Sequence, residues 1–394
     1  MKLRDSISFD NTANAFTSKS DKELKKMQLL FSIMHWEYLT KIGTKIVNSA
    51  IKFNFPITNI LKATLFKQFC GGETLQECES TIKNLRSSGV YTILDYSVEG
   101  EDKEENFEKN MMVFEKIIEL DAKSESVIFS VIKISSIAAP DILEKIQQGI
   151  SLSNSENEIF EKIKIRLDKI CKKAYENKVK ILIDAEESWI QGSIDVLVYS
   201  MMSKYNKEGA YIFNTYQMYR TDMSYNLKNA LSIAQRDNFI LGVKIVRGAY
   251  MSKEKSRAEK MGYVYPIFNS KIETDTAFNE GLAFCIKNLN NIELCCGSHN
   301  EESTLLLIEL MKRNSISATD ARITFSQLFG MGDHISYNLA FGGYRAAKYL
   351  PFGPLKDVLP YLFRRAEENN SIAGQNHRQL SLINQEIKRR KKNF

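Results

Sequence analysis

The chain has 394 residues, of which 43% are hydrophobic and 26% are charged. This length holds one large barrel-type domain with additional helices or two ordinary domains, and the apolar content excludes an intrinsically disordered chain. The formal net charge is only +6, and much of it lies in the basic run at residues 388–392. The basic character is therefore a feature of the C-terminal tail and not of a basic domain, and we expect no nucleic-acid partner.

Six cysteines occur, and none has the C-x-x-C spacing of a metal or redox motif. We expect free, buried thiols in a reducing compartment. The chain contains no run of about 18 apolar residues, and its first residues lack the apolar core of a signal peptide. These features predict a soluble, cytoplasmic protein. Its basic tail is a candidate for peripheral contact with anionic lipid at the inner face of the cell membrane, and a solvated terminus is the alternative.

The first part of the chain has helical periodicity. Apolar residues recur every three to four positions from residue 20 to about residue 53, and a second helical stretch is expected over residues 56–86. We therefore predict an N-terminal helical region at residues 1–88 that packs on the rest of the protein.

From residue 89 onward, short β-branched and apolar runs alternate with segments of helical period. Strands are predicted at residues 90–96, 126–134, 179–184, 211–216, 241–246, 292–296, 322–326 and 346–350. Successive β–α units of this kind predict a closed parallel (βα)8 barrel of the TIM type over residues 89–375, followed by a helical basic tail at residues 376–394. A doubly wound sheet is the alternative, but no G-x-G-x-x-G motif follows any strand.

Polar residues follow nearly every predicted strand, where the catalytic groups of such barrels lie. They are Asp95, Glu99, Lys133, Asp184, Glu186, Gln217, residues 247–250, residues 298–300, Gln327 and Tyr349. Ordinary capping would place such residues at only one or two strands. The set therefore predicts a polar ligand bound across the carboxyl ends of the strands.

Some of these positions favour particular roles. Lys133 and Asp184 each end an apolar strand, so we expect them to be partly buried and paired, either to position a cofactor and move a proton or as a structural ion pair. In Arg247-Gly-Ala-Tyr250 the two small residues would let the backbone approach a planar or phosphorylated ligand, although a plain tight turn has the same pattern. His299 is a candidate for stacking on a cofactor or for a structural hydrogen bond.

Asp184, Glu186 and His299 are also residue types that bind metal ions. Lys133 and two arginines later in the chain would repel a cation, and the chain has no H-x-H pair. A metal-dependent barrel lyase or hydrolase is thus a minor alternative, and no metal is expected.

The stretch after the last strand carries an unusual helix face. If Asp357 is the N-cap, Pro360 falls in the first turn, where its missing N–H is tolerated. One side of the helix then carries, at i, i+3, i+4 and i+7, Tyr361, Arg364, Arg365 and Glu368. Two adjacent arginines suit a carboxylate ligand, with the tyrosine as a wall beside it. A solvated charged face with an intrahelical ion pair has the same pattern.

Together these motifs resemble the proline dehydrogenase family. The resemblance rests on Leu94-Asp-Tyr96, Ile132-Lys-Ile134, Asp184-Ala-Glu-Glu187, Thr215-Tyr-Gln-Met-Tyr219, Lys244-Ile-Val-Arg-Gly-Ala-Tyr250, Ser298-His-Asn300, Gln327-Leu-Phe-Gly-Met-Gly-Asp333 and the stretch at residues 344–369. It implies a distorted (βα)8 barrel that holds FAD. It also implies oxidation of L-proline to 1-pyrroline-5-carboxylate, with hydride transfer to the flavin and electron delivery to a quinone, as the first step of proline catabolism.

The same resemblance implies the site residues. The substrate site would consist of Lys133, Asp184, Tyr250, Tyr349, Tyr361, Arg364, Arg365, Glu368 and Glu99. Within it the two arginines would clamp the proline carboxylate, the tyrosines Tyr349 and Tyr361 would pack on the ring, and Glu99 would pair with Arg364 as a gate. The flavin would be held by Gln217, Lys244, Val246, Gly248, Ala249, Lys271, Ser298 and His299.

Two residues refine this expectation. Lys244 stands where many family members have an arginine, which keeps the charge but loses the planar fork. Tyr349 leaves little room for a ring hydroxyl and favours proline over hydroxyproline, with hydroxyproline dehydrogenase as the alternative. The chain resembles the monofunctional type, without an aldehyde dehydrogenase domain. A third hypothesis, from a different class, is a non-catalytic basic binding module built around residues 388–392.

Overall fold

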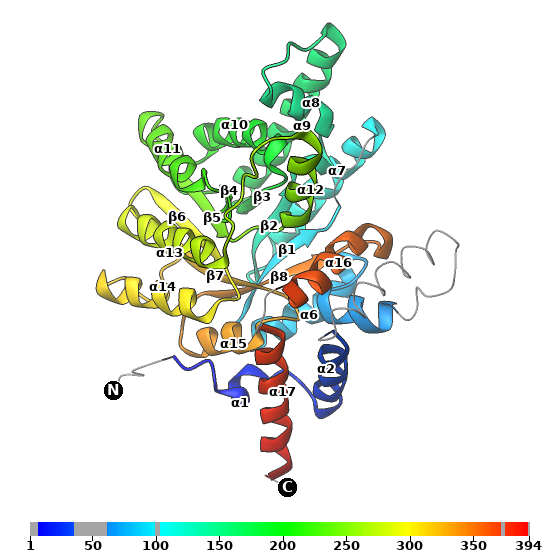
Figure 1. Ribbon diagram of the computed structural model, residues 1–394, viewed down its shortest axis with the longest axis vertical. Helices are drawn as coiled ribbons and strands as arrows, with labels where there is room; N and C mark the ends of the chain where they lie inside the picture. Colours follow the sequence, from blue (N-terminus) through cyan, green and yellow to red (C-terminus); the bar gives the residue numbers. More distant parts are fainter. Residues whose placement is uncertain (1–6, 35–60, 99–102, 372–374, 393–394) are drawn as a thin grey trace. The chain divides into compact units, whose positions relative to one another are not determined.

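The computed structural model describes residues 7–34, 61–98, 103–371 and 375–392. Its strands are β1 Tyr91–Tyr96, β2 Val127–Lys133, β3 Ile181–Asp184, β4 Ile212–Gln217, β5 Leu241–Val246, β6 Ile292–Gly297, β7 Ile323–Leu328 and β8 Ala346–Phe352. They form one closed barrel in the order β1-β2-β3-β4-β5-β6-β7-β8 (Figure 1). The predicted (βα)8 fold and each predicted strand are confirmed, and the doubly wound alternative is wrong because such a sheet is open.

Helices precede and follow the strands. Before β1 come α1 Thr12–Ala15, α2 Asp21–Met34, the π-helix η1 Lys62–Phe66, α5 Lys67–Phe69 and α6 Leu75–Ser87. After β1 come α7 Glu104–Asp121, the 3-10 helix η2 Ile134–Ser136, α8 Pro140–Gln147, α9 Asn154–Glu176, α10 Ser188–Tyr205, α11 Met223–Arg236, α12 Met251–Met261, α13 Lys271–Lys287, α14 Glu301–Arg313, α15 Asp333–Phe341, α16 Leu355–Ser371 and α17 Gln375–Lys392. The helix predicted over residues 20–53 is confirmed up to Met34, and residues 35–60 lie outside the described part. The stretch predicted over residues 56–86 is interrupted at residues 70–74.

Capping boxes set the starts of two helices. Ser153 before α9 and Ser270 before α13 each accept the backbone N–H of the third helical residue, and Glu156 and Glu273 at those positions bond back to the cap. This exchange satisfies backbone N–H groups that a helix start leaves without partners. For α13 it fixes the position of Lys271, the first helical residue.

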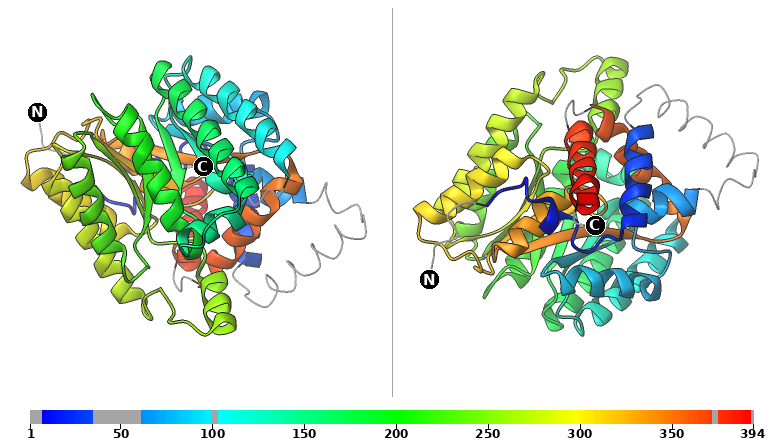
Figure 2. Two further views of the ribbon diagram at one scale, coloured as in Figure 1. Left: turned by 90° about the horizontal axis from the view of Figure 1, so that it is seen from above. Right: turned by 90° about the horizontal axis from the view of Figure 1, so that it is seen from below.

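Two compact units divide the chain. The continuous unit comprises residues 98–325, and the discontinuous unit combines residues 1–97 with residues 326–394. Within the discontinuous unit, α2 and α17 lie side by side, as Figure 2 shows. They share with α16 an apolar cluster that includes Phe31, Phe69, Val358, Leu362 and Leu382. The core of this unit is therefore built from both ends of the sequence.

The basic C-terminal segment is tied into the discontinuous unit through α17. Glu386 is fully buried and accepts hydrogen bonds from Arg389 and Arg390, each at 2.8 Å. Arg390 also donates to the carbonyls of Phe16 and Lys19, at 2.9 and 2.8 Å. Two of the cations in the predicted tail thus serve internal contacts.

The helix after β8 starts earlier than predicted. It begins at Leu355, so Asp357 lies inside its first turn and is not the N-cap, and Pro360 is a residue of the helix interior. Gly353, with φ +140°, turns the chain after the strand, and the Leu355 N–H donates to the Glu73 carboxylate at 3.0 Å. The helix start is thus set by a residue far away in the sequence. Pro360 has no N–H for the carbonyl of Lys356, which is the ordinary consequence of an interior proline.

All six cysteines are buried free thiols, as predicted. Burial raises the pKa of Cys78 and of Cys296 to about 12, so these thiols stay protonated. Among the described residues, no helix has both the length and the apolar content needed to cross a bilayer.

Candidate active site

A carboxylate lies between two lysines at the carboxyl ends of strands in the continuous unit. Lys133 of β2 stands opposite Asp184 of β3 in the parallel ladder, and the Lys133 Nζ is 3.9 Å from Asp184 Oδ2. Lys244 of β5 donates a hydrogen bond to Asp184 Oδ1. The side chains of Lys133, Asp184 and Lys244 are 8%, 14% and 6% exposed. The predicted Lys133–Asp184 pair is confirmed, and Lys244 is a second cation beside the same carboxylate.

Glu186 follows this cluster on the chain and is buried. Its Oε1 accepts the backbone N–H of Ser135 at 2.8 Å. Burial raises the pKa of the Glu186 carboxyl to about 7, although the Ser135 hydrogen bonds and the charge of Lys133 act in the opposite direction. The Glu186 carboxyl therefore keeps its proton to a higher pH than an exposed glutamate does.

Gln217, the last residue of β4, ties neighbouring strand ends together. Its Nε2 donates to the Glu186 carbonyl at 2.8 Å, and its Oε1 accepts the Ala249 N–H at 3.1 Å. An amide has two N–H donors. Within the described part of the chain, Gln217 therefore retains one N–H for a ligand.

The turn after β5 requires a glycine at position 248. Gly248 has φ +143°, and a Cβ added there would lie 2.4 Å from the ring of Tyr219. The close approach predicted from the two small residues is thus made by a tyrosine of the same unit. Tyr250, two residues later, is buried, and the Lys253 Nζ lies 5.3 Å from its ring centroid.

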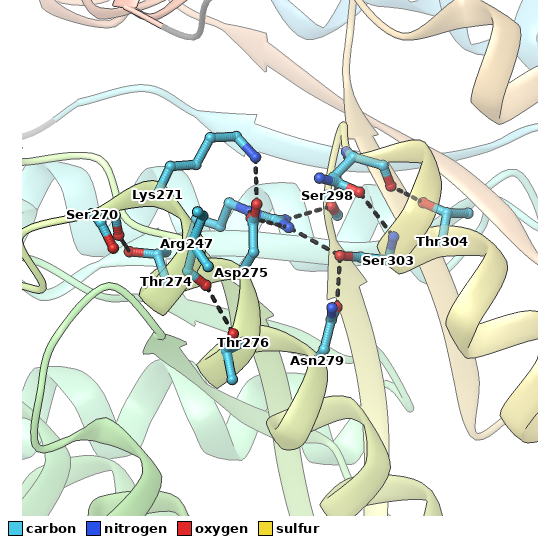
Figure 3. A network of polar contacts seen from close by, with 12 residues as sticks. Arg247, Ser270, Lys271, Thr274, Asp275, Thr276, Asn279, Ser298, Ser303 and Thr304 are labelled. Atoms are coloured by element: carbon cyan, nitrogen blue, oxygen red, sulfur yellow. Dashed lines mark hydrogen bonds and ion pairs between the residues drawn. The ribbon is translucent and has the colours of Figure 1, made fainter.

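Arg247 organises a second polar cluster, drawn in Figure 3. Its Nε donates to Asp275 of α13 at 2.7 Å, its Nη1 to the Ser298 hydroxyl at 2.9 Å, and its Nη2 to the Ser303 hydroxyl at 2.9 Å. The guanidinium also lies 4.3 Å from the ring centroid of Phe278. One side chain thus joins the end of β5, the helix α13 and the segment after β6.

Lys271 completes this second cluster. It pairs with Asp275, which therefore faces two cations. Burial raises the pKa of Asp275, but hydrogen bonds from Lys271 and Arg247 outweigh it and leave that pKa below its ordinary value. The N-termini of α13 and α14, the latter capped by Asn300, add partial positive charge. In this cluster two cations therefore share one carboxylate.

Sequence reasoning missed part of this arrangement. Arg247 was predicted only as part of the strand-end set and of the turn at residues 247–250, and Asp275 and Ser303 were not predicted at all. The signal for Arg247 was present, because a cation directly after a buried strand lies among the strand-end residues. Asp275 and Ser303 lie on helices and have no such signal.

The predicted arginine face lies in the discontinuous unit. Arg365 and Tyr361 of α16 are both buried, and the guanidinium carbon lies 5.1 Å from the tyrosine ring centroid. Arg364 is half-buried. Tyr349 of β8 is also buried. A fully solvated charged face is therefore wrong for Arg365.

The remaining predicted residues stand as follows. Val246 ends β5, and His299 is half-buried after β6. Glu99 lies outside the described residues. Glu368 belongs to α16, but its side chain also lies outside the described part.

The metal-dependent alternative would require a cluster of metal-binding side chains. Among the described residues, no three His, Cys, Asp or Glu side chains come close enough together to hold a metal ion. Asp184, Glu186 and His299 do not form such a group.

Comparisons with known proteins identify the family of the chain. The family model described as "Proline dehydrogenase" matches residues 78–378. Proline dehydrogenase 1, mitochondrial, of Dictyostelium discoideum is 33% identical over 96% of this chain and 74% of its own length. Hydroxyproline dehydrogenase of Xenopus laevis is 29% identical over 98% of this chain and 90% of its own length.

A solved structure shares the fold. The crystal structure of proline utilization A from Bdellovibrio bacteriovorus, inactivated by N-propargylglycine, matches with a TM-score of 0.72 and 19% identity. The match covers 96% of this chain but only 41% of that chain, so the chain spans about two-fifths of the length of that protein. The family match over most of the sequence, together with the identity to the Dictyostelium relative, shows that the chain belongs to the proline dehydrogenase family.

Proposed function

We propose that the protein is an FAD-dependent dehydrogenase that oxidises L-proline to 1-pyrroline-5-carboxylate and passes the electrons to a quinone. Family membership supports the substrate. The observation that carries the proposal is the cluster in which Arg247 and Lys271 share the Asp275 carboxylate beside the N-termini of α13 and α14. Forked N–H donors, an ammonium group and helix N-termini together favour a ligand that carries phosphate.

The donor set of the continuous unit fits FAD. Arg247, Lys271 and the N-termini of α13 and α14 suit the diphosphate, since helix N-termini and forked donors both bind phosphate oxygens. Ser298 and His299 would serve the rest of the dinucleotide. Lys244, Val246, Gln217 and the Gly248-Ala249 backbone would hold the ring system. When bound, the flavin would accept the two electrons removed from the substrate.

The discontinuous unit supplies residues suited to the substrate. Arg364 and Arg365 would bind the proline carboxylate through paired N–H donors. Tyr349 and Tyr361 would pack against the apolar ring, and Lys133, Tyr250 and Glu368 would line the site. The Glu99–Arg364 gate stays a prediction.

In the proposed reaction, the ring carbon next to nitrogen would lose a hydride to the flavin and the nitrogen would lose a proton to solvent, which would leave a C=N double bond. Asp184 would orient the ammonium groups of Lys133 and Lys244 in the site.

Hydroxyproline is the second candidate substrate, because the Xenopus relative carries that name. Tyr349 argues for proline. Its phenol ring is buried, and a hydroxyl group on the substrate would need both space and a polar partner beside it.

The quinone acceptor is proposed from the family resemblance. A peripheral membrane contact is proposed from the basic residues in the last turn of α17. Arg389 and Arg390 bind Glu386, so lipid contact would fall to the neighbouring Lys388, Lys391 and Lys392. Each lysine near an anionic surface contributes about 1 kcal/mol. Co-sedimentation with anionic vesicles, compared with neutral ones, tests this contact.

The visible spectrum under anaerobic conditions tests the main proposal. We expect the purified protein to be yellow and to bleach when L-proline is added. Arg365→Met should retain the flavin but need a far higher proline concentration to bleach, because the carboxylate loses a charged donor pair. Arg378→Met is the matched control. This arginine of α17 pairs with Asp10 near the surface, and its loss should leave bleaching unchanged.

Three outcomes would contradict the proposal. A protein that cannot take up FAD rejects the cofactor. A yellow protein that does not bleach with proline rejects the substrate. Equal behaviour of the Arg365→Met and Arg378→Met variants rejects the role of the α16 face.

A further inference from the structure

A second buried ion pair lies next to Tyr349. The Lys348 Nζ is 2.7 Å from Asp333 Oδ1, and the two side chains are 1% and 3% exposed. Successive strand residues point to opposite faces, so Lys348 points away from the face on which Tyr349 lies. No role assigned so far uses this pair.

The Lys348 ammonium contacts several points of the loop that connects β7 to α15. It donates to the carbonyl of Met331 and lies 3.5 Å from the carbonyl of Leu328. Asp333 is the first residue of α15. An ammonium has three N–H donors, and here they face three points along residues 328–333.

This connection depends on contacts outside itself. Gly330 has φ +79°, and a Cβ there would lie 2.1 Å from the carbonyl oxygen of Gln68. Gln68 also donates from Nε2 to the Gly330 carbonyl at 2.8 Å. The loop is therefore held in one conformation by Gln68 on one side and Lys348 on the other.

The same loop holds the backbone of Tyr349. The Phe329 N–H donates to the Tyr349 carbonyl at 2.8 Å. On its other side, β8 pairs with β1, where Ile93 stands opposite Tyr349. Tyr349 is thus fixed by β1 and by a loop that Lys348 anchors.

We infer that Lys348 and Asp333 are a positioning pair that holds the loop at residues 328–333 against Tyr349 and thereby sets the selection of proline over hydroxyproline. The inference rests on the proposed function. An apolar pair of the same volume would fill the space with less desolvation, but it could not bond to the loop carbonyls. Without those bonds the loop can shift, Tyr349 gains freedom, and room opens for a ring hydroxyl.

The test uses the full-length protein with the double variant Lys348→Met/Asp333→Asn. Removing both charges avoids leaving one buried charge alone, so the variant should fold and retain flavin. We expect amide exchange at Phe329 to become at least about ten-fold faster, in line with the loss of a buried hydrogen bond. We also expect the ratio of kcat/KM for proline to that for hydroxyproline to fall about ten-fold, mainly through KM.

A matched control separates positioning from stability. Lys180 and Glu293 form another partly buried ion pair, at the amino ends of β3 and β6 in the continuous unit. Lys180→Met/Glu293→Gln should lower the melting temperature without changing exchange at Phe329 or the substrate ratio. If the single variant Lys348→Met does not fold, the double variant still gives the answer.

The outcomes are distinguishable. A folded double variant with normal exchange at Phe329 overturns the inference, whatever the enzyme does with proline. Faster exchange with an unchanged substrate ratio also overturns it, since the pair would then serve the fold alone. A wild-type protein that does not oxidise proline refutes the proposed function, and the selectivity half of the inference with it, whereas the exchange experiment still decides the loop half.

Discussion

Lysine is buried against aspartate in two regions of this molecule, and the two arrangements differ in what the lysines contact. In the continuous unit, Lys133 and Lys244 converge on one carboxylate, that of Asp184. In the discontinuous unit, Lys348 pairs with Asp333 and directs its other donors at backbone carbonyls. In the first arrangement the carboxylate has two lysine partners, and in the second the lysine holds a loop. The contacts of the lysines therefore distinguish the two regions better than burial does.

Replacing Lys348 alone should have the largest effect on stability and tests the contrast between the two regions most strongly. Lys348→Met leaves the buried Asp333 carboxylate without the lysine that binds it, and we expect the free energy of unfolding to fall by about 3–5 kcal/mol. Urea unfolding followed by circular dichroism measures this loss. A loss below that of an ordinary surface substitution would mean that Asp333 is not buried as an ion.

The two regions should also differ in how their contribution to stability depends on pH. The Glu186 pKa is raised from 4.5 to about 7, so its protonated form stabilises the fold below about pH 4.5, and this contribution is lost as the pH rises through about 7. For Asp333 burial raises the pKa, but Lys348 and Lys19 outweigh it and lower the pKa below 3.8. Its contribution is therefore present above that value and is lost as the pH falls.

Glu186→Gln, which imitates the protonated form, checks the first of these contributions. Relative to the wild type, the variant should gain about 3 kcal/mol in unfolding free energy between the two pKa values. Urea midpoints across that pH range give the difference. A constant difference between variant and wild type would show that Glu186 does not titrate there.

Removing one of two lysines should matter much less for stability. Lys133→Met leaves Asp184 bonded to Lys244, and we expect a loss of about 1 kcal/mol in unfolding free energy. Proline oxidation should fall more steeply, by about 10- to 100-fold in kcat/KM, if Lys133 contacts the substrate. A stability loss as large as that of Lys348→Met would contradict the contrast between the two regions.

The smallest stability effect is expected at Lys271, which is 58% exposed. Lys271→Ala should change the unfolding free energy by no more than about 0.5 kcal/mol, because exposed pairs of this spacing contribute little. Flavin binding, followed by fluorescence titration of the apoprotein, should weaken. Arg313→Ala removes the comparable exposed pair with Glu309 and should leave flavin affinity unchanged. Equal affinities in the two variants would remove Lys271 from the flavin site.

Much of the fold follows from periodicity, whereas the side-chain contacts follow from it only in part. The pairing of Lys133 with Asp184 was predictable, since both residues end neighbouring apolar strands. The start of α16 was not, because its first N–H bonds to Glu73, and no local signal in the sequence announces a contact of that range. Lys348 resembles an ordinary strand residue in the sequence. Its partner Asp333 is the first residue of α15 and does not directly follow a strand, so the pattern of polar strand ends does not connect the two residues.

The discontinuous core has a consequence for the order in which the protein can form during synthesis. Its apolar cluster combines Phe16 and Phe31 with Leu382 and Ile383, so it cannot close before residues 382 and 383 have left the ribosome. The continuous unit consists of residues 98–325 and contains no residue from the C-terminal part of the cluster. Contacts of long sequence separation form slowly, so a nascent chain exposes the apolar face of α2 until α17 has been synthesised.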